Sequence, residues 1–223
     1  MTNPPHTVQR LVAGNLPWHE HRDAYVAVVL NGSYQETGDQ GRLRAEAGHV
    51  LLHLPFERHA NHVATDGARV VNIPVSLGEA LHLRSMRSAD PEQTLRAISQ
   101  GQSIVDALAG GEPGPFHWLD EEADALALGL THGDEQSFET FAAEHGIAGR
   151  TLRRRFEHLY GISAAKFRAR ARARSAWREI LTSTATFATI ACNLGFADQA
   201  HMCRAVATLT GASPSAWRRQ LAI

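Results

Sequence analysis

The last third of the chain repeats a pattern of a short amphipathic helix, a glycine and a second helix. In the first copy, Gly146 precedes a helix that we expect from about residue 148 to residue 160. In the second copy, Gly195 precedes a helix that we expect to begin after Asp198. One such unit often occurs by chance. Two units joined by a long basic segment predict tandem helix-turn-helix motifs that bind DNA.

The first unit presents arginine on one side of its second helix. Leu152 and Phe156 are four residues apart and are expected to face a small core. Arg150, Arg153 and Arg154 then lie on the outer face, because residues three and four apart share a side of a helix. A recognition helix in the major groove needs this arrangement.

The second unit repeats this arrangement with fewer charges. Asp198 is expected to cap its second helix, and Met202 and Val206 are expected to point inward. The outward positions hold Gln199, His201 and Arg204. An alternative role for Arg204 is a structural salt bridge to a neighbouring carboxylate.

A basic helix expected over residues 162–181 joins the two units. Its arginines surround the helix, so they cannot all contact DNA, and some must pair with acids or remain solvated. They are Arg168, Arg170, Arg172, Arg174 and Arg178.

The net charge of −1 conceals an uneven distribution of charged residues. Residues 131–223 carry 13 Lys and Arg against 7 Asp and Glu, whereas residues 1–130 carry 9 against 16. This asymmetry suggests two modules, only one of which meets a polyanion. Lys166 is the only lysine, and arginine suits bidentate contact with phosphate or guanine. A general preference for arginine codons would give the same composition.

Residues 18–80 predict short strands separated by turns. The expected strands are residues 24–30, 33–37, 42–46, 50–54 and 68–75. Turn signals fall at Asn31-Gly32, at residues 38–41 and at Ala47-Gly48. Short strands at this spacing predict a small β-barrel or sandwich.

Residues 86–130 are expected to be helical. Asp90 is a candidate N-cap, Pro91 occupies the first helical position, and the helix can extend to Leu108. A second apolar helix is expected from Trp118 to Leu130. The two helices either pack against the strands or form a helix pair in a dimer.

Histidines are frequent among the expected strands. His19 and His21 are spaced as His-x-His, which places both rings on one face of a strand, and His53, His59 and His62 follow. Three imidazoles that converge in a barrel mouth would suit a divalent Zn, Ni, Fe or Mn ion. The same side chains could instead line a polar pocket or lie on the surface.

Residues 137–219 resemble the DNA-binding domain of the AraC/XylS transcription factors. The resemblance rests on the two bridged helix-turn-helix units and on a late motif made of Ile190-Ala191, Gly195-Phe196, Arg204 and the Gly-Ala-Ser-Pro sequence of residues 211–214. It implies base or backbone contacts from Arg150, Arg153, Arg154, Gln199, His201 and Arg204.

Three residues depart from the usual pattern of this family. His201 and Met202 occupy positions where a serine and then an aromatic residue are usual, and Val206 replaces an aromatic residue. These departures suggest a looser core in the second unit or a changed base preference.

The strand region resembles the cupin-like regulatory domain of the same family. Leu30-Asn31-Gly32, Ala47-Gly48, Pro55 and His59 follow one another in the order that the family shows. His59 falls where metal-binding cupins place a later ligand, so the candidate metal ligands are His19, His21 and His59, with His53 as a further candidate. The acid that many metal cupins supply is missing, since residues 25–29 are Tyr-Val-Ala-Val-Val. Most regulators of this family use the barrel for an organic ligand or a peptide-like arm.

We therefore expect an α+β protein with three parts. Residues 1–85 form a cupin-like β-barrel that senses a ligand or metal, and residues 86–130 form a helical linker that either packs against the barrel or pairs in a dimer. Residues 131–223 form an all-α DNA-binding domain with two helix-turn-helix units. Two cysteines, Cys192 and Cys203, are expected to be reduced thiols.

The expected function is that of a sequence-specific transcriptional regulator, with activation as its mode. Its partners would be double-stranded DNA, a small-molecule or metal effector, a second copy of the chain and RNA polymerase. The alternatives are a metal-dependent cupin enzyme that carries a DNA-binding domain, and a DNA-binding module without a ligand. No run of about 18 apolar residues and no signal peptide occur, so we expect a cytoplasmic, nucleoid-associated protein without a membrane segment.

Overall fold

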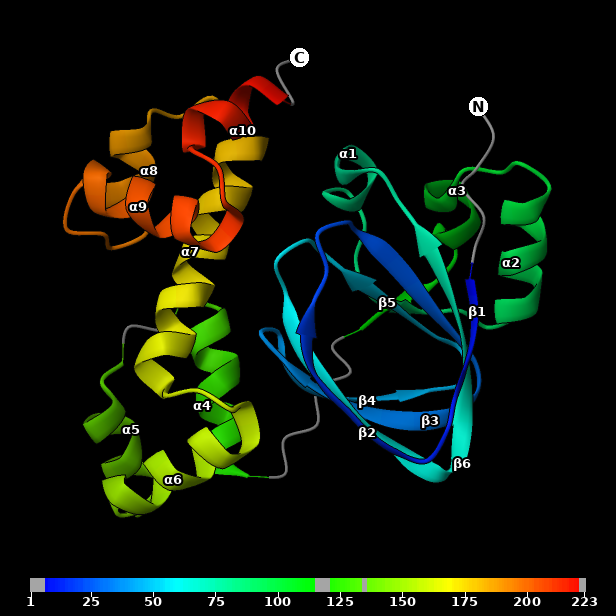
Figure 1. The fold of residues 1–223 in the computed structure, drawn as a ribbon, viewed down its shortest axis with the longest axis horizontal. Coiled ribbons are helices and arrows are strands. Elements are labelled where there is room, and N and C mark those ends of the chain that lie inside the picture. Colours follow the sequence, from blue (N-terminus) through cyan, green and yellow to red (C-terminus); the bar gives the residue numbers. More distant parts are fainter. Residues whose placement is uncertain (1–6, 115–120, 134–135, 221–223) are drawn as a thin grey trace. The chain divides into compact units, whose positions relative to one another are not determined.

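The computed structural model describes residues 7–114, 121–133 and 136–220. The chain divides into two compact units (Figure 1). A sheet unit contains residues 1–38 and 42–118, and a helical unit contains residues 39–41 and 119–223. Each unit has its own buried core, so each is described by itself.

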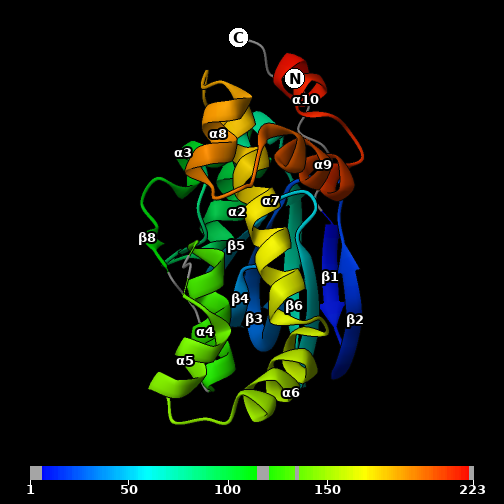
Figure 2. The same cartoon turned by 90° about the vertical axis from the view of Figure 1, so that its left-hand side faces the viewer.

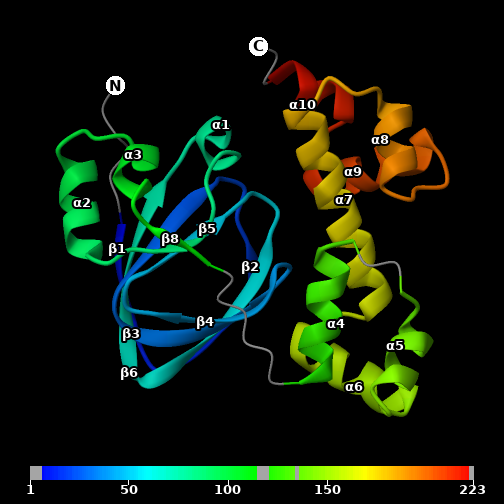
Figure 3. The same cartoon turned by 180° about the vertical axis from the view of Figure 1, so that it is seen from behind.

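One antiparallel sheet dominates the sheet unit (Figure 3). Its path runs β1-β6-β3-β5-β7-β8, with β2 paired to β6 and β4 paired to β3. The eight strands are β1 (Thr7–Leu11), β2 (Gly14–Glu20), β3 (Tyr25–Gly38), β4 (Gly41–Glu46), β5 (His49–His53), β6 (Arg58–Pro74), β7 (Met86–Arg87) and β8 (Glu112–Pro113).

The predicted strand-rich N-terminal region is confirmed, but the pairings of the described strands do not close its sheet into the expected barrel. The long strand β6 pairs along one edge with β3. Its other edge pairs first with β2 and then with β1. The opposite end of the sheet is formed by β7 and β8, two residues each, and no described pairing joins them to β1 or β2.

The hairpin turn predicted at Asn31-Gly32 is wrong, because both residues lie inside β3. The register with β6 shifts on both sides of this pair, which is the mark of a β-bulge. Gly32 has a φ of +73°, and a Cβ there would lie 2.0 Å from the carbonyl oxygen of Gly67. Glycine therefore allows β3 to bend against β6 without leaving the sheet.

Three short helices complete the sheet unit: α1 (Leu77–Ala80), α2 (Pro91–Ser99) and α3 (Ile104–Leu108). The single helix expected from Pro91 to Leu108 is wrong, since Gly101, with a φ of +93°, lies between α2 and α3. Asp90 caps α2 as predicted. Ile98, Ile104 and Leu108 are buried in one core with residues of the sheet.

The helical unit contains two groups of helices joined by one long helix (Figure 2). The helices are α4 (Glu122–Thr131), α5 (Phe138–Glu144), α6 (Gly149–Tyr160), α7 (Ala164–Thr182), α8 (Phe187–Asn193), α9 (Gln199–Thr210) and α10 (Pro214–Gln220). Trp118 and Leu119, where we expected α4 to begin, lie outside the described residues. None of the described helices is long and apolar enough to cross a membrane.

The predicted cap at Asp198 is confirmed, and two serines cap other helices of this unit in the same way. Ser137, Ser163 and Asp198 each accept a hydrogen bond from a backbone N–H of the first turn. Gly161 and Gly211 end α6 and α9 in the left-handed conformation. Local sequence thus sets the bounds of both helix-turn-helix motifs, which are α5–α6 and α8–α9.

Residues 86–130 are divided between the two units. Helices α2 and α3 share the core of the sheet. Leu126 and Leu130 of α4 instead join Leu152, Phe156 and Phe167 in the core of the first motif. The stretch that we expected to be one linker therefore supplies packing to two different cores.

A buried hydrogen bond ties α4 to α6. The hydroxyl group of Tyr160 donates to Asp124 Oδ1 at 2.8 Å, and both residues are 1% exposed. The other carboxylate oxygen of Asp124 accepts from the backbone N–H of Glu121 at the start of α4.

The variant Tyr160→Phe removes the donor and leaves a buried carboxylate less well satisfied. We expect the free energy of unfolding to fall by about 1–3 kcal/mol. Urea denaturation followed by helical circular dichroism measures this change. Asp124→Asn, which keeps the acceptor oxygen, should cost less than Asp124→Ala, and equal stability of Tyr160→Phe and wild type would contradict the role of this bond.

Candidate nucleic-acid interface and metal centre

The second helix of the first motif, α6, separates arginines from apolar residues. Arg150, Arg153 and Arg154 are exposed, whereas Leu152 and Phe156 are completely buried. The guanidinium group of Arg153 lies 5.6 Å from the ring centre of Phe138, a contact that holds its stem against the motif.

Neighbouring arginines of α6 differ in their partners. Arg155 pairs with Glu122 of α4 at 3.1 Å, so it serves the packing of the motif. Arg150 and Arg154 form no ion pair with any residue that the structure describes. Their charges are therefore available to a polyanion.

The second helix of the second motif, α9, has the same arrangement. Gln199, His201 and Arg204 are exposed, and Met202 and Val206 are completely buried. Two of the three departures from the family pattern, Met202 and Val206, are therefore part of the buried core. Within the described part of the chain Arg204 has no carboxylate partner, so the alternative of a structural salt bridge is not realised there.

Most arginines of the joining helix α7 have structural partners, as their distribution around the helix predicted. Arg168 donates to the carbonyl oxygen of Gln136, and Arg172 donates to that of Gly195 at 2.8 Å. Arg170 and Arg174 pair with Asp39. Arg178 is exposed and has no ion pair among the described residues.

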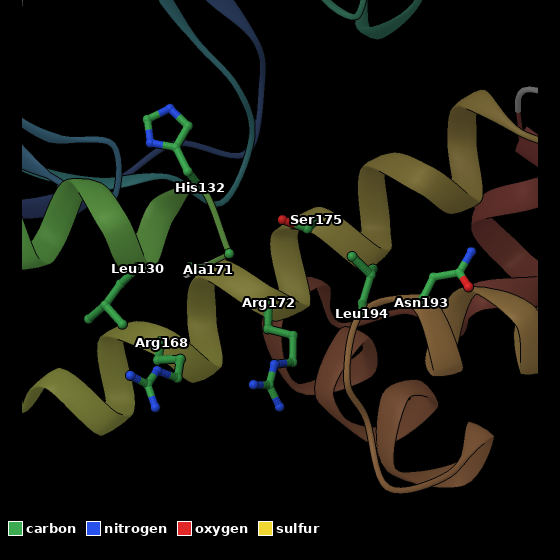
Figure 4. A pocket seen from close by; sticks show the side chains of 9 residues that line it. Leu130, His132, Arg168, Ala171, Arg172, Ser175, Asn193 and Leu194 are labelled. Atoms are coloured by element: carbon green, nitrogen blue, oxygen red, sulfur yellow. The ribbon is translucent and has the colours of Figure 1, made fainter. Parts of the chain in front are cut away.

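Arg168 and Arg172 also line a hollow of about 210 Å³ within the helical unit (Figure 4). Its wall comes from the end of α4, the middle of α7 and the end of α8, and it includes His132 and Asn193. The hollow lies between the two motifs. Its lining contains two arginines and no carboxylate, so its surroundings are positively charged.

In the sheet unit, the structure brings together the three histidines implied as metal ligands. His19 lies in β2 opposite His59 of β6, and His21 follows the end of β2. One ring nitrogen of each lies within 4.8 Å of the others. The ring centres of His19 and His59 are 4.2 Å apart. His62 is not part of this group, because it is exposed and hydrogen-bonds Asn15.

A second set of candidate ligands shares His59 with the first. It consists of Glu36, His53 and His59, all buried, with one donor atom of each within 4.8 Å of the others. Tyr25 stacks on His53 with ring centres 4.5 Å apart, and its hydroxyl group lies 3.5 Å from His59 Nε2. The two sets thus form one continuous group, which we call the histidine cluster: His19, His21, Glu36, His53 and His59.

Burial favours the uncharged forms within the histidine cluster. It raises the pKa of the Glu36 carboxyl to about 8, and the charge of Glu57 adds to this effect. Burial also lowers the pKa of His53 well below its usual value, with a further contribution from His59. His53 Nδ1 lies 3.8 Å from Glu36 Oε1, too far for a hydrogen bond, so burial outweighs their attraction.

These residues fit a divalent transition metal. Neutral imidazole is the form that binds a metal, and burial holds His53 in that form. Burial lowers the pKa of His21 as well, with the charge of His19 as the next cause. Nitrogen donors with one carboxylate are typical of Zn²⁺ sites and also suit Ni, Fe or Mn.

Comparison with known proteins identifies the helical unit. Residues 141–220 match a protein family described as a helix-turn-helix domain. They form an AraC-type domain. This match agrees with the resemblance of residues 137–219 to the DNA-binding domain of the AraC/XylS transcription factors.

Several solved structures are similar to parts or all of this chain. The DNA-binding domain of AdpA in complex with a target DNA is 28% identical, covering 45% of this chain and 92% of that chain, with a TM-score of 0.41. An AraC-type regulator from Chromobacterium violaceum is 21% identical, covering 45% and 89%, with a TM-score of 0.40. ToxT from Vibrio cholerae is 11% identical, covering 99% of each chain, with a TM-score of 0.45. No curated protein matches the sequence.

Sequence reasoning missed Glu36 of the histidine cluster. The acid was sought directly after the His-x-His pair, whereas Glu36 lies eleven residues beyond Tyr25, near the far end of β3. One signal was available, because Tyr34 and Glu36 alternate on the inner face of the strand. Burying an acid costs free energy unless the acid is paired, hydrogen-bonded or bound to a metal, so its presence on the inner face marks a candidate ligand.

Glu36 predicts a specific dependence of stability on pH in the metal-free protein. The pKa of Glu36 is about 8 in the folded state, against an ordinary value of 4.5 for the unfolded chain. Between these pH values the folded protein keeps a proton on Glu36 that the unfolded chain loses. The free energy of unfolding should fall as pH rises from about 5 to about 8. The Glu36→Gln side chain cannot ionise. The free energy of unfolding of this variant should therefore rise relative to that of wild type by up to about 1.4 kcal/mol per pH unit.

Urea denaturation in EDTA at pH 5, 6, 7 and 8 measures this difference. Asp66→Asn, which replaces an exposed acid on β6, is the matched control and should follow wild type. Parallel profiles for Glu36→Gln and wild type would show that Glu36 is ionised in the fold.

Proposed function

We propose that this protein is an AraC-type transcriptional regulator, which binds a specific DNA sequence through α6 and α9 and responds to a divalent transition metal held by the histidine cluster. The observation that carries the DNA part is the separation of faces on both helices. Every expected contact residue is exposed, whereas Leu152, Phe156, Met202 and Val206 of the same helices are completely buried.

The two recognition helices have complementary roles in this proposal. The three exposed arginines of α6 supply charge for phosphate and a planar fork for guanine. On α9, Gln199 and His201 add polar groups beside a single cation, Arg204. The helices would enter successive segments of the major groove, about 34 Å apart along the duplex.

Substituting a base-reading arginine should weaken specific binding without unfolding the motif. We expect Arg153→Ala and Arg204→Ala each to cost about 1–3 kcal/mol in the free energy of binding to a selected operator. Gel-shift titration against DNA selected from a random pool measures this cost.

Arg155→Ala is the matched control for DNA binding. Arg155 lies on the same helix as Arg153 but pairs with Glu122. Its substitution should leave affinity nearly unchanged. Unchanged affinity in both Arg153→Ala and Arg204→Ala would reject α6 and α9 as the reading helices.

The metal part of the proposal is supported by the convergence of donors from separate strands. Strands β2, β3, β5 and β6, or the residues that follow them, all contribute to one cluster. An organic effector would not need five ionisable donors so close together. Metal is therefore favoured over an organic ligand for this site.

Metal binding should stabilise the wild-type protein. Zinc chloride at about 100 times its Kd should raise the free energy of unfolding by about 2.7 kcal/mol. His21→Ala and His59→Ala should lose this gain, because each removes a donor of the cluster. Thermal unfolding of protein purified without a histidine tag, with and without zinc, measures the effect.

His62→Ala is the control for metal binding, because His62 lies on β6 like His59 but outside both ligand sets. It should keep the full gain from zinc. A gain that survives in both His21→Ala and His59→Ala would place any zinc elsewhere and reject the cluster as its site.

A further inference from the structure

Asp39 occupies an unusual place in the chain. It lies between the end of β3 at Gly38 and the start of β4 at Gly41. The chain up to Gly38 and from Arg42 onward belongs to the sheet unit, yet residues 39–41 pack as part of the helical unit. The side chain of Asp39 is only 2% exposed. A buried carboxylate of this kind requires charged partners.

Two arginines of α7 supply these partners. Arg170 donates from Nε and Nη2 to Asp39 Oδ2 at 3.1 and 3.0 Å. Arg174 Nη1 lies 2.8 Å from the same oxygen as an ion pair, and its Nη2 donates to the backbone carbonyl oxygen of Asp39. Arg174 is itself buried. One carboxylate therefore holds two guanidinium groups one helical turn apart.

Helix α7 is the element that joins the two DNA-binding motifs. Arg168 bonds to the segment before α5, and Arg172 bonds to the turn between α8 and α9. The residues that Asp39 holds, Arg170 and Arg174, alternate along α7 with these two anchors. The Asp39 clamp thus acts on the part of α7 from which both motifs are positioned.

The histidine cluster lies close to Asp39 along the chain. Glu36 is one of its candidate ligands, and only Thr37 and Gly38 separate it from Asp39. A metal that draws in the Glu36 carboxylate must reposition the end of β3. Such a movement reaches Asp39 through three peptide bonds.

We infer that Asp39 is the positioning residue through which metal binding at the histidine cluster alters DNA binding by the two motifs. This inference rests on the proposed function, since it assumes that the cluster binds metal. Asp39 either keeps both guanidinium groups or releases them. Release leaves a buried cation without its partner, so the two arrangements are discrete rather than graded.

The test compares DNA affinity in zinc chloride and in EDTA for wild type and variants. For an allosteric coupling of ordinary size, the two Kd values of wild type should differ by about 5- to 150-fold. In Asp39→Asn and Arg170→Gln the ratio should fall below about 2-fold, by the same definition of coupling. Arg178→Gln, an exposed arginine of the same helix, is the matched control and should keep the wild-type ratio.

Zinc binding, measured by competition with a chromogenic chelator, should persist in all three variants. This measurement distinguishes a variant that no longer couples zinc binding to DNA affinity from a variant that no longer binds zinc. A wild-type ratio in both Asp39→Asn and Arg170→Gln would overturn the role of Asp39. Arg170 is partly exposed, so its substitution keeps the test available if Asp39→Asn does not fold.

A failure of the metal proposal gives a different result. Wild type would then bind no zinc in the competition assay, and the coupling inference would fall with it. The clamp itself is tested in the absence of zinc by hydrogen exchange. Asp39→Asn should speed exchange of the amides of residues 170–178, whereas unchanged exchange would show that Asp39 does not hold α7.

Discussion

The helical unit depends on one helix whose buried face serves two cores. Phe167 of α7 packs among Leu152, Phe156 and Tyr160 of the first motif. Farther along α7, Trp177 and Ile180 are buried, as are Ile190 and Met202 of the second motif. Because neither motif is large enough for a core of its own, α7 supplies the missing apolar surface to both. The spacing of the recognition helices follows from this shared packing.

In the histidine cluster, burial costs stability, whereas the burial of apolar residues around α7 provides it. The ionisable groups of the cluster are buried in a sheet, where charged forms are costly. Burial keeps His53 neutral and Glu36 protonated near neutral pH. This state is unfavourable for the metal-free fold as pH rises, but it leaves imidazoles ready to bind a cation. The proposed metal site would account for this cost in stability, which packing does not offset.

Local signals predicted the helical unit well and the sheet less well. Capping residues such as Ser137 and Asp198 act within one helical turn, so the sequence alone locates their helices. Asn31-Gly32 has the composition of a hairpin turn but forms a bulge, because β6 pairs with β3 on both sides of it. Gly101, with its positive φ, breaks the helix expected across it. In each error, a contact or a backbone conformation outweighed local propensity.

The sequence by itself determined the two helix-turn-helix motifs, their exposed recognition residues and the His-x-His pair, since all depend on periodicity over a few residues. Only the tertiary structure decided which distant side chains meet. The register of β2 on β6 places His19 opposite His59, and the bulged course of β3 brings Glu36 to the cluster. Asp39 likewise meets Arg170 across 131 residues of chain. Such pairings depend on strand register and packing, which no local pattern encodes.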